Sequence, residues 1–131
     1  MSLLYKLFGV PRTFDEFVDK IKKRRDRKVR VALVTNVMDE MDGRPTFRYS
    51  VEIHSGRARL RLSSRIFEMI VPNLEYTKGE LRGLTRDLLR EGIGIAERLK
   101  QQGLEVTVGK ENYSIERARE ELRKYETAPD Q

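Results

Sequence analysis

Hydrophobic positions along the chain change their spacing several times, and each change marks the boundary of an expected element. A stripe at helical spacing runs from Phe14 to Ile21, directly after Thr13 and Glu16, which form a capping box. Residues 29–38 are apolar on both faces of a period-two pattern, which is typical of a central strand covered on both sides. The chain therefore predicts a helix from residue 13, a strand over 29–38 and a polar turn over 39–45.

The clearest pattern is a pair of alternating segments, 46–54 and 57–63, joined by Ser55 and Gly56. A two-residue connection of this kind predicts a tight hairpin. The register that follows pairs Ile53 with Ala58, Val51 with Leu60 and Tyr49 with Leu62 on the apolar face, and His54 with Arg57, Glu52 with Arg59, Ser50 with Arg61 and Arg48 with Ser63 on the polar face.

Helical spacing returns after the hairpin. Residues 64–71 predict a short helix that Pro72 ends. A second capping box at Thr77 and Glu80 opens a long amphipathic helix, and Gly103 is a plausible C-terminal cap for it.

Gly92 and Gly94 fall inside this long helical pattern, and each costs about 1 kcal/mol relative to alanine. Gly92 lies on the apolar stripe, where the missing side chain allows close approach to a sheet. The alternative is a break or hinge at this point, and we favour the continuous helix.

The last two elements are a strand over 104–108 and a helix capped by Ser114. A helix between two strands normally crosses over to a parallel strand, and the natural neighbour is the strand over 29–38. We therefore expect an α+β fold: a three-stranded antiparallel meander plus a fourth strand after the long helix, in a mixed sheet of order 3-2-1-4. The expected division is an apolar segment over 1–12, a single domain over 13–126 and a frayed tail over 127–131.

Composition excludes several kinds of site. The 131 residues include no cysteine and one histidine, which excludes disulfides, thiolate zinc sites and His-rich metal sites. No apolar run is long enough to span a membrane, and no signal-peptide pattern is present, so we expect a cytoplasmic protein that needs no cofactor. Abundant charge and few amides favour a heat-adapted source.

The net charge of +6 is local. Residues 1–30 hold ten basic and four acidic residues, whereas basic and acidic residues balance over 31–131. The basic run at the end of the first helix carries this excess, and it consists of Lys22, Lys23, Arg24, Arg25, Arg27 and Lys28, with Arg30 just beyond. Such a run binds nucleic acid or an acidic surface in some proteins, and the alternative is a well-terminated helix with a solvated linker.

The polar face of the hairpin is the second basic region. It consists of Arg48, Arg57, Arg59 and Arg61, together with His54. Arginines on a sheet face can bind a phosphate backbone, because the guanidinium makes bidentate contacts with phosphate. Two alternatives are open: a solvated face with a Glu52–Arg59 pair, or a face covered by a helix or a second subunit.

Other groups of polar residues give weaker indications of a functional site. Asp39, Glu40 and Asp42 could hold a divalent cation, but their spacing does not follow a calcium loop, and an ordinary charged turn is favoured. His54 is adjacent to Ser55 on a strand, where neighbouring side chains point apart, so no nucleophile and base are paired. We therefore expect no catalytic residues, and an enzyme is the least favoured class.

Two resemblances rest on element order. Three strands, helix, strand and helix over 29–125 resemble the start of an RNase H-like fold. That family carries an aspartate in its first strand, and none lies in 29–38, so the resemblance implies a non-catalytic relative. Helix, three strands and helix over 13–102 look like a double-stranded-RNA-binding domain, although residues 77–82 lack its lysine- and alanine-rich helix start.

These observations favour a small non-enzymatic protein that binds nucleic acid through the basic run and the hairpin face. The alternative is a protein-interaction subunit or adaptor with no nucleic-acid role. In that case the apolar N-terminal patch would dock on a partner or on a second copy, and it consists of Leu3, Leu4, Leu7 and Phe8.

Overall fold

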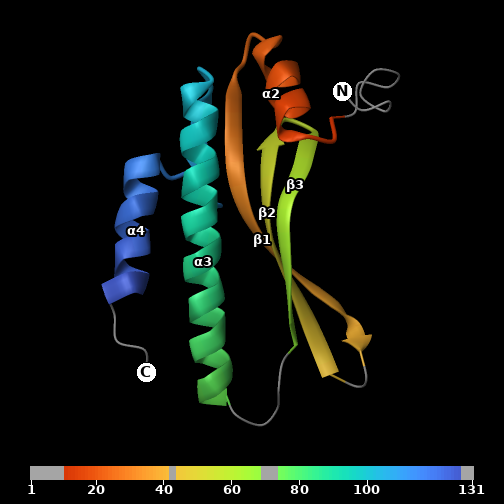
Figure 1. Cartoon of the computed structure of the whole chain (residues 1–131), viewed down its shortest axis with the longest axis vertical. Helices are drawn as coiled ribbons and strands as arrows, with labels where there is room; N and C mark the ends of the chain where they lie inside the picture. Colours follow the sequence, from red (N-terminus) through yellow and green to blue (C-terminus); the bar gives the residue numbers. More distant parts are fainter. Residues whose placement is uncertain (1–10, 42–43, 69–73, 128–131) are drawn as a thin grey trace.

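The computed structural model describes residues 11–41, 44–68 and 74–127 (Figure 1). In chain order the elements are α2 (Phe14–Lys22), β1 (Lys28–Met41), β2 (Arg44–Ser55), β3 (Ala58–Glu68), α3 (Leu74–Gln101), β4 (Glu105–Val108) and α4 (Ile115–Thr127). The four strands form one mixed sheet of order β3-β2-β1-β4, in which β1 is antiparallel to β2 and parallel to β4. The expected α+β class, strand order and parallel fourth strand are confirmed.

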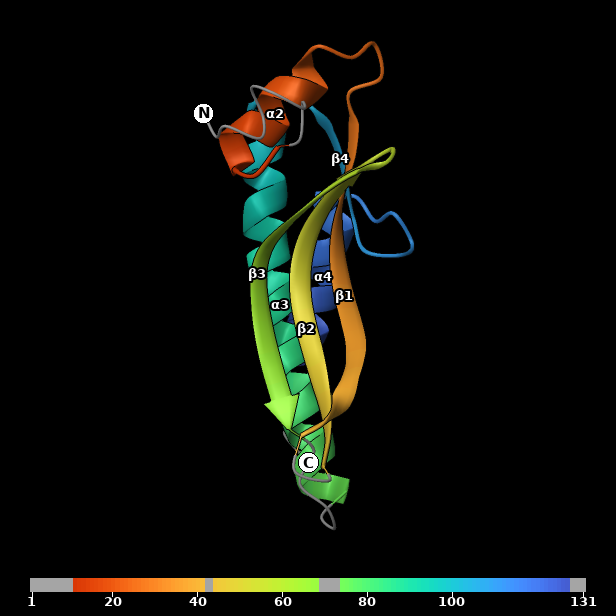
Figure 2. The ribbon, with the colours of Figure 1, turned by 90° about the vertical axis from the view of Figure 1, so that its right-hand side faces the viewer.

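The helices cover one face of this sheet. Figure 2 shows α3 behind the strands and α4 behind α3. The short helix α2 packs beside α3, where the Arg98 guanidinium lies 4.2 Å from the centre of the Phe14 ring. Across the described residues no helix covers the opposite face, which we call the open face.

The hydrophobic core lies between the covered face and the helices. The sheet contributes fully buried side chains such as Val31, Val51 and Ile53, and α3 contributes Leu99. From α2, Phe17 is also fully buried. The rest of the core cluster consists of Val18, Ile21, Val29, Ala58, Leu88, Leu89, Ile93, Ala96, Leu104, Val108, Ile115 and Ala118. The apolar residues of the expected helices and strands thus pack together between the sheet and the helices.

Strand β1 is central, as its doubly apolar pattern predicts, because β2 and β4 pair with its two sides. Its doubly apolar pattern is typical of a strand covered on both sides, but in the described part of the chain the helices cover one face only. On the open face, Ala32 is buried and Val34 is half-buried without a helix above them. The polar turn expected over 39–45 is also shorter, since β1 extends to Met41 and β2 begins at Arg44.

Helix α3 is continuous through Gly92 and Gly94, which confirms the favoured interpretation. A Cβ on Gly92 would lie 3.1 Å from Cδ2 of Leu33 and 3.4 Å from Cγ1 of Val31, so the missing side chain lets α3 lie close against β1. Gly103 adopts a φ of +82° just after the helix. Its N–H donates to the Lys100 carbonyl at 3.0 Å, and the expected glycine cap is confirmed.

Two expected helix boundaries are wrong. Residues 64–68 continue β3 instead of forming a short helix, because the first residues of β2 provide a pairing partner: Thr46 pairs with Glu68 and Phe47 with Phe67. Helix α3 begins at Leu74, so Thr77 lies inside the helix and is not its cap. Long-range strand pairing therefore overrides the local helical spacing after the hairpin.

The hairpin forms, but its turn lies one residue later than expected. Ser55 pairs with Ala58, so the turn residues are Gly56 and Arg57. Gly56 has a φ of +60°, and Arg57 is not among the described residues with positive φ. Glycine at the first turn position alone is the pattern of a type II′ turn, which matches the twist of the flanking strands.

The new register preserves the faces and changes the partners. Moving the turn by one residue moves the partner of each β2 residue two positions along β3. Because side chains alternate between the two faces with a period of two, every side chain near the turn keeps its face. Ile53 now pairs with Leu60, and Glu52 pairs with Arg61 rather than Arg59. A β-bulge between Val51 and Glu52 then places the additional residue Leu62 in β3.

Several expectations fall on residues outside this description. The apolar patch over residues 3–8 lies there, as does Asp42. The backbone of Asp39 and Glu40 belongs to β1, and their side chains are not described. Helix α4 is capped as expected, since the Ser114 hydroxyl accepts from the Arg117 N–H at 3.1 Å.

Candidate nucleic-acid interface

Four polar side chains form a row across the open face. Arg30 in β1 pairs with Thr107 in β4 on one side and with His54 in β2 on the other, and His54 pairs with Arg59 in β3. Residues directly opposite in a sheet project from the same face. The sheet order therefore brings together side chains that lie far apart along the chain.

A second row contains the one buried carboxylate of the described open face, Glu52. His54 Nε2 lies 2.8 Å from Glu52 Oε1, and Arg61 Nε lies 3.4 Å from Oε2. The Ser50 hydroxyl donates to Oε2 at 3.2 Å. Burial raises the pKa of the Glu52 carboxyl, but the hydrogen bonds from His54, Arg61 and Ser50 outweigh it, so its pKa lies below the ordinary 4.5.

Glu52 also orients Arg30 through His54. An ionised carboxylate only accepts hydrogen bonds, so His54 donates from Nε2. In the neutral ring Nδ1 is then an acceptor, and Arg30 Nη2 lies 3.4 Å from it. Glu52, His54 and Arg30 form a chain in which each polar group fixes the next.

The structure joins the basic run to the hairpin turn. Arg24 Nη1 donates to the backbone carbonyl of Ser55 at 3.0 Å and lies 3.3 Å from its hydroxyl oxygen. The Ser55 hydroxyl donates in turn to the carbonyl of Lys28 at 2.7 Å. The end of α2, the start of β1 and the turn are therefore held in one place.

The candidate residues divide into two groups. Lys22 donates to Gln102 Oε1 at 2.8 Å, next to the end of α3, and Lys23 pairs with Asp19 at 3.3 Å. Lys22 is thus engaged with the residue after α3, and Lys23 with its own helix. Arg24 and Arg57 lie at the hairpin turn, and Lys28, Arg59 and Arg61 lie on strands with side chains toward the open face. Arg25 and Arg27 lie in the segment between α2 and β1. The side chain of Arg48 lies outside the description.

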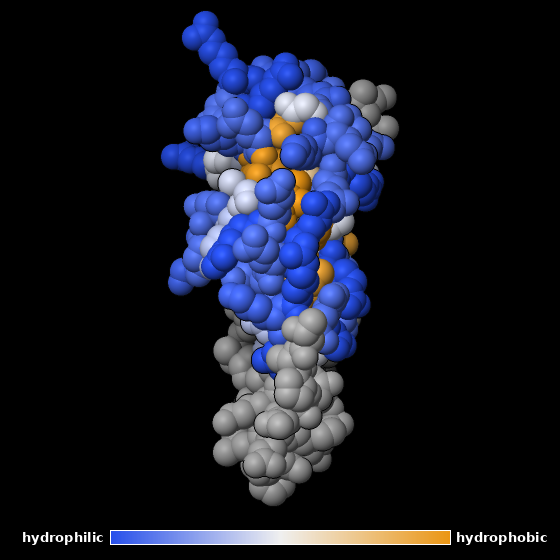
Figure 3. Space-filling view, turned by 90° about the vertical axis from the view of Figure 1, so that its left-hand side faces the viewer, coloured by the Kyte–Doolittle hydropathy of each residue, from blue (hydrophilic) through white to orange (hydrophobic). Residues whose placement is uncertain are grey.

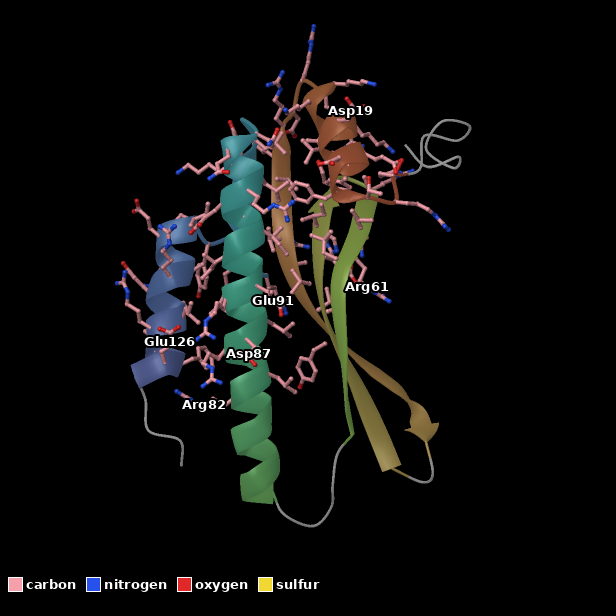
Figure 4. All side chains as sticks on the ribbon, viewed as in Figure 1. Asp19, Arg61, Arg82, Asp87, Glu91 and Glu126 are labelled. Atoms are coloured by element: carbon pink, nitrogen blue, oxygen red, sulfur yellow. The ribbon has the colours of Figure 1, made fainter. Side chains whose placement is uncertain are left out.

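Charge pairing separates the open face from the helices. Arg25, Arg27, Arg57 and Arg59 are exposed, and none has an ion-pair partner in the described part of the chain. Four arginines of α3 and α4 are instead paired with carboxylates, as in Arg90–Glu126, Arg117–Glu121 and Arg119–Glu97. Arg82 and Arg98 of α3 lie over the rings of Tyr125 and Phe14. Figure 4 shows this contrast: Asp87 and Glu126 lie on the side of α3 and α4, and Arg61 extends from β3 away from α3.

The side of the molecule that carries α4 is mainly hydrophilic, with a narrow apolar seam (Figure 3). Its charges largely neutralise one another, because arginine and glutamate alternate along α4 at spacings of three and four residues. Arg57 and Arg59, which have no carboxylate partner among the described residues, lie at the hairpin turn and at the start of β3.

A groove lies above the start of β1 on the open face. Its volume is about 530 Å³, and Ser55 and Gly56, at the end of β2 and in the turn, line one side while Thr107 and Asn112 line the other. Lys28, Arg30 and His54 line it as well. Sequence reasoning missed Thr107 and Asn112 as site residues. The expected order 3-2-1-4, combined with strand alternation, already held the signal for Thr107.

Comparison with protein-family models, with curated proteins and with solved structures finds no match. The element orders behind the two resemblances are present over residues 14–127, but neither family is shown. None of the described helices is long and apolar enough to cross a membrane.

Proposed function

We propose that this protein binds nucleic acid through phosphate contacts made by its basic face. The basic face consists of the cations on the open face, at the hairpin turn and in the segment between α2 and β1: Arg25, Arg27, Lys28, Arg30, Arg57, Arg59 and Arg61. The observation that supports the proposal most is the distribution of ion pairs. Arg57 and Arg59 have no carboxylate partner among the described residues, whereas Arg86, Arg90, Arg117 and Arg119 on α3 and α4 each pair with a carboxylate.

Unpaired guanidinium groups suit this role for a physical reason. An arginine already bonded to a carboxylate must lose that bond before it contacts a phosphate, whereas Arg57 and Arg59 offer their donors directly. Guanidinium–phosphate contacts are bidentate and charge-assisted. Each phosphate that a protein neutralises also releases condensed counterions, so binding weakens steeply as salt rises.

The same face favours backbone contact over base reading. No aromatic side chain projects from its described part, and Tyr49 packs against the core. Single-strand binders use such aromatics as stacking platforms for bases. Phosphate contacts position a protein on nucleic acid without reading its sequence. The proposal therefore predicts similar affinity for unrelated sequences of equal length.

The test is fluorescence anisotropy with a labelled duplex and a labelled single strand over a salt series. The variant is Arg57→Gln/Arg59→Gln, which spares Arg61 because that residue holds Glu52. We expect weaker binding on every sequence and a salt slope reduced by about one to two on duplex DNA.

The matched control is Arg117→Gln/Arg119→Gln on α4, which changes the net charge by the same amount. It should leave the salt slope close to that of the wild type. Equal loss in both double variants would mean that total charge, not this face, drives binding. Negligible binding at low salt would overturn the proposal, and self-association in sedimentation would then favour the protein-interaction alternative.

A further inference from the structure

We infer that the groove above β1 holds one nucleotide by its terminal phosphate, either the end of a strand or a free mononucleotide. This inference rests on the proposed function and adds a specific site to it. The groove volume of about 530 Å³ falls within the range of small-molecule sites. The two walls, at the hairpin turn and at residues 107–112, limit the ligand to a short unit rather than a long strand.

Two cations on β1 provide the groups that would contact the phosphate. Arg30 has no ion-pair partner within the described residues, and His54 Nδ1 orients its guanidinium at 3.4 Å. Lys28 lines the same groove, and its side chain is exposed and unpaired among those residues. A terminal phosphate carries up to two negative charges, whereas an internal phosphodiester carries one. Two cations therefore favour the terminal form.

Groups suited to a sugar or a base come from β4, directly beside these cations, since Glu105 pairs with Lys28 and Thr107 with Arg30. Glu105 lines the groove, and its carboxylate accepts hydrogen bonds from hydroxyl and amino groups. The Thr107 hydroxyl donates to Asn112 Oδ1 at 3.1 Å, which leaves the Asn112 amide NH₂ as a donor. The hydroxyl and amino groups of a nucleotide can form hydrogen bonds with Glu105, Thr107 and Asn112. Inorganic phosphate has no sugar or base to make these contacts.

Asn112 is held in position by its backbone. Its φ of +54° lies in the left-handed region, which asparagine tolerates better than most residues. Its N–H donates to the Gly109 carbonyl at 3.1 Å, and Tyr113 and Val108 exchange two backbone hydrogen bonds beside it. These hydrogen bonds therefore hold the wall opposite the hairpin turn in a defined conformation.

The experiment measures binding of one oligonucleotide sequence with a 5′-phosphate, a 3′-phosphate or hydroxyl ends, and of a free nucleoside monophosphate. We expect a terminal phosphate to strengthen binding about tenfold, because it gains charge-assisted hydrogen bonds from Arg30 and Lys28. Preference for a phosphorylated oligonucleotide assigns the site to strand ends, and binding of the mononucleotide alone assigns it to the free ligand.

Arg30→Gln should abolish the phosphate preference, and Thr107→Val, which is nearly isosteric, should reduce it. The matched control is Arg59→Gln, in the same row but outside the groove lining, which should weaken all oligonucleotides equally. If hydroxyl-ended and phosphorylated oligonucleotides bind alike and the mononucleotide does not bind, the groove inference is wrong and the proposed function stands. If no oligonucleotide binds at low salt, the proposed function is wrong instead.

Discussion

Arg24 Nη1 lies 3.0 Å from the carbonyl oxygen of Ser55, and this contact fixes the end of α2 against the hairpin turn. The two residues are 31 positions apart in the chain. Their contact joins the two basic regions, because Arg24 belongs to the basic run and Ser55 directly precedes the hairpin turn. Arg24 thus positions the end of α2 against the hairpin turn.

Replacing Arg24 by alanine should destabilise the domain by about 1–2 kcal/mol, because a part-buried carbonyl loses a charged donor. The measurement is urea unfolding. Lys23→Ala is the control, since the Lys23–Asp19 pair is exposed and contributes about 0.5 kcal/mol or less. Equal destabilisation by both substitutions would contradict the role assigned to Arg24.

Gly92 and Gly94 should respond oppositely to alanine. A Cβ on Gly94 meets nothing within 4 Å, so Gly94→Ala should stabilise the domain by up to about 1 kcal/mol through helix propensity. At Gly92 the new Cβ would lie 3.1 Å from Leu33, and the strain should cancel or exceed that gain. Thermal unfolding of the two variants checks this, and an equal rise in Tm would argue against close packing of α3 on β1.

Gly56→Ala should destabilise the domain by about 1–2 kcal/mol, because its φ of +60° disfavours any residue with a Cβ. Arg57→Ala tests the neighbouring turn position, where the described backbone has no positive φ, and should cost much less. Denaturant unfolding measures both. A larger cost at Arg57 would contradict the type II′ turn over Gly56 and Arg57.

The pH dependence of stability should report on Glu52. Because its pKa is lowered in the folded state, the ionised carboxylate contributes stability above its unfolded pKa of about 4.5. That contribution is lost as the pH falls through the lower folded pKa. The stability difference between wild type and Glu52→Gln should therefore be constant near neutral pH and shrink below about pH 4.5.

Arg61→Ala refines this measurement. It removes one of the three donors to Glu52, so the acid-dependent loss should begin at a higher pH than in the wild type. Chemical unfolding at a series of pH values provides both curves. A difference between wild type and Glu52→Gln that does not change below pH 4.5 would mean that the hydrogen bonds to Glu52 do not stabilise the fold.

Much of the fold could be predicted because its signals are local or repeated. The faces of the hairpin residues were predicted correctly although the turn was placed one residue too early. A shift of two positions in the register leaves Ile53 and Glu52 on their original faces. The strand order followed from the apolar pattern of β1 and from the crossover rule. These inferences depend on periodicity, which the sequence carries directly.

What sequence reasoning missed depends on pairing between distant segments. Residues 64–68 have helical spacing, and only the length of β2 makes them a strand. The bulge at Val51 and Glu52 has no sequence signal that separates it from regular alternation. The groove was missed for a similar reason, because Thr107 and Asn112 reach Arg30 only through the crossover to β4.

The basic regions were identified from charge density, which did not show which cations are free. Lys22 and Lys23 belong to the same run as Arg25 and Arg27, yet Lys22 bonds to Gln102 after α3 and Lys23 pairs with Asp19 on α2. Ion-pair partners come from whichever element packs nearby. Their identity therefore appears only once the helices and strands are placed.

The parallel pairing of Lys28–Val31 with Glu105–Val108 has a consequence for hydrogen exchange. Arg30 and Val31 are paired on both sides, with β2 and with β4, and Val29 and Val31 lie in the core. Amides in such a segment exchange only when the domain unfolds globally. The β1 residues that line the groove thus belong to the last part of the sheet to open. The side chain of Arg30 therefore projects from a rigid strand.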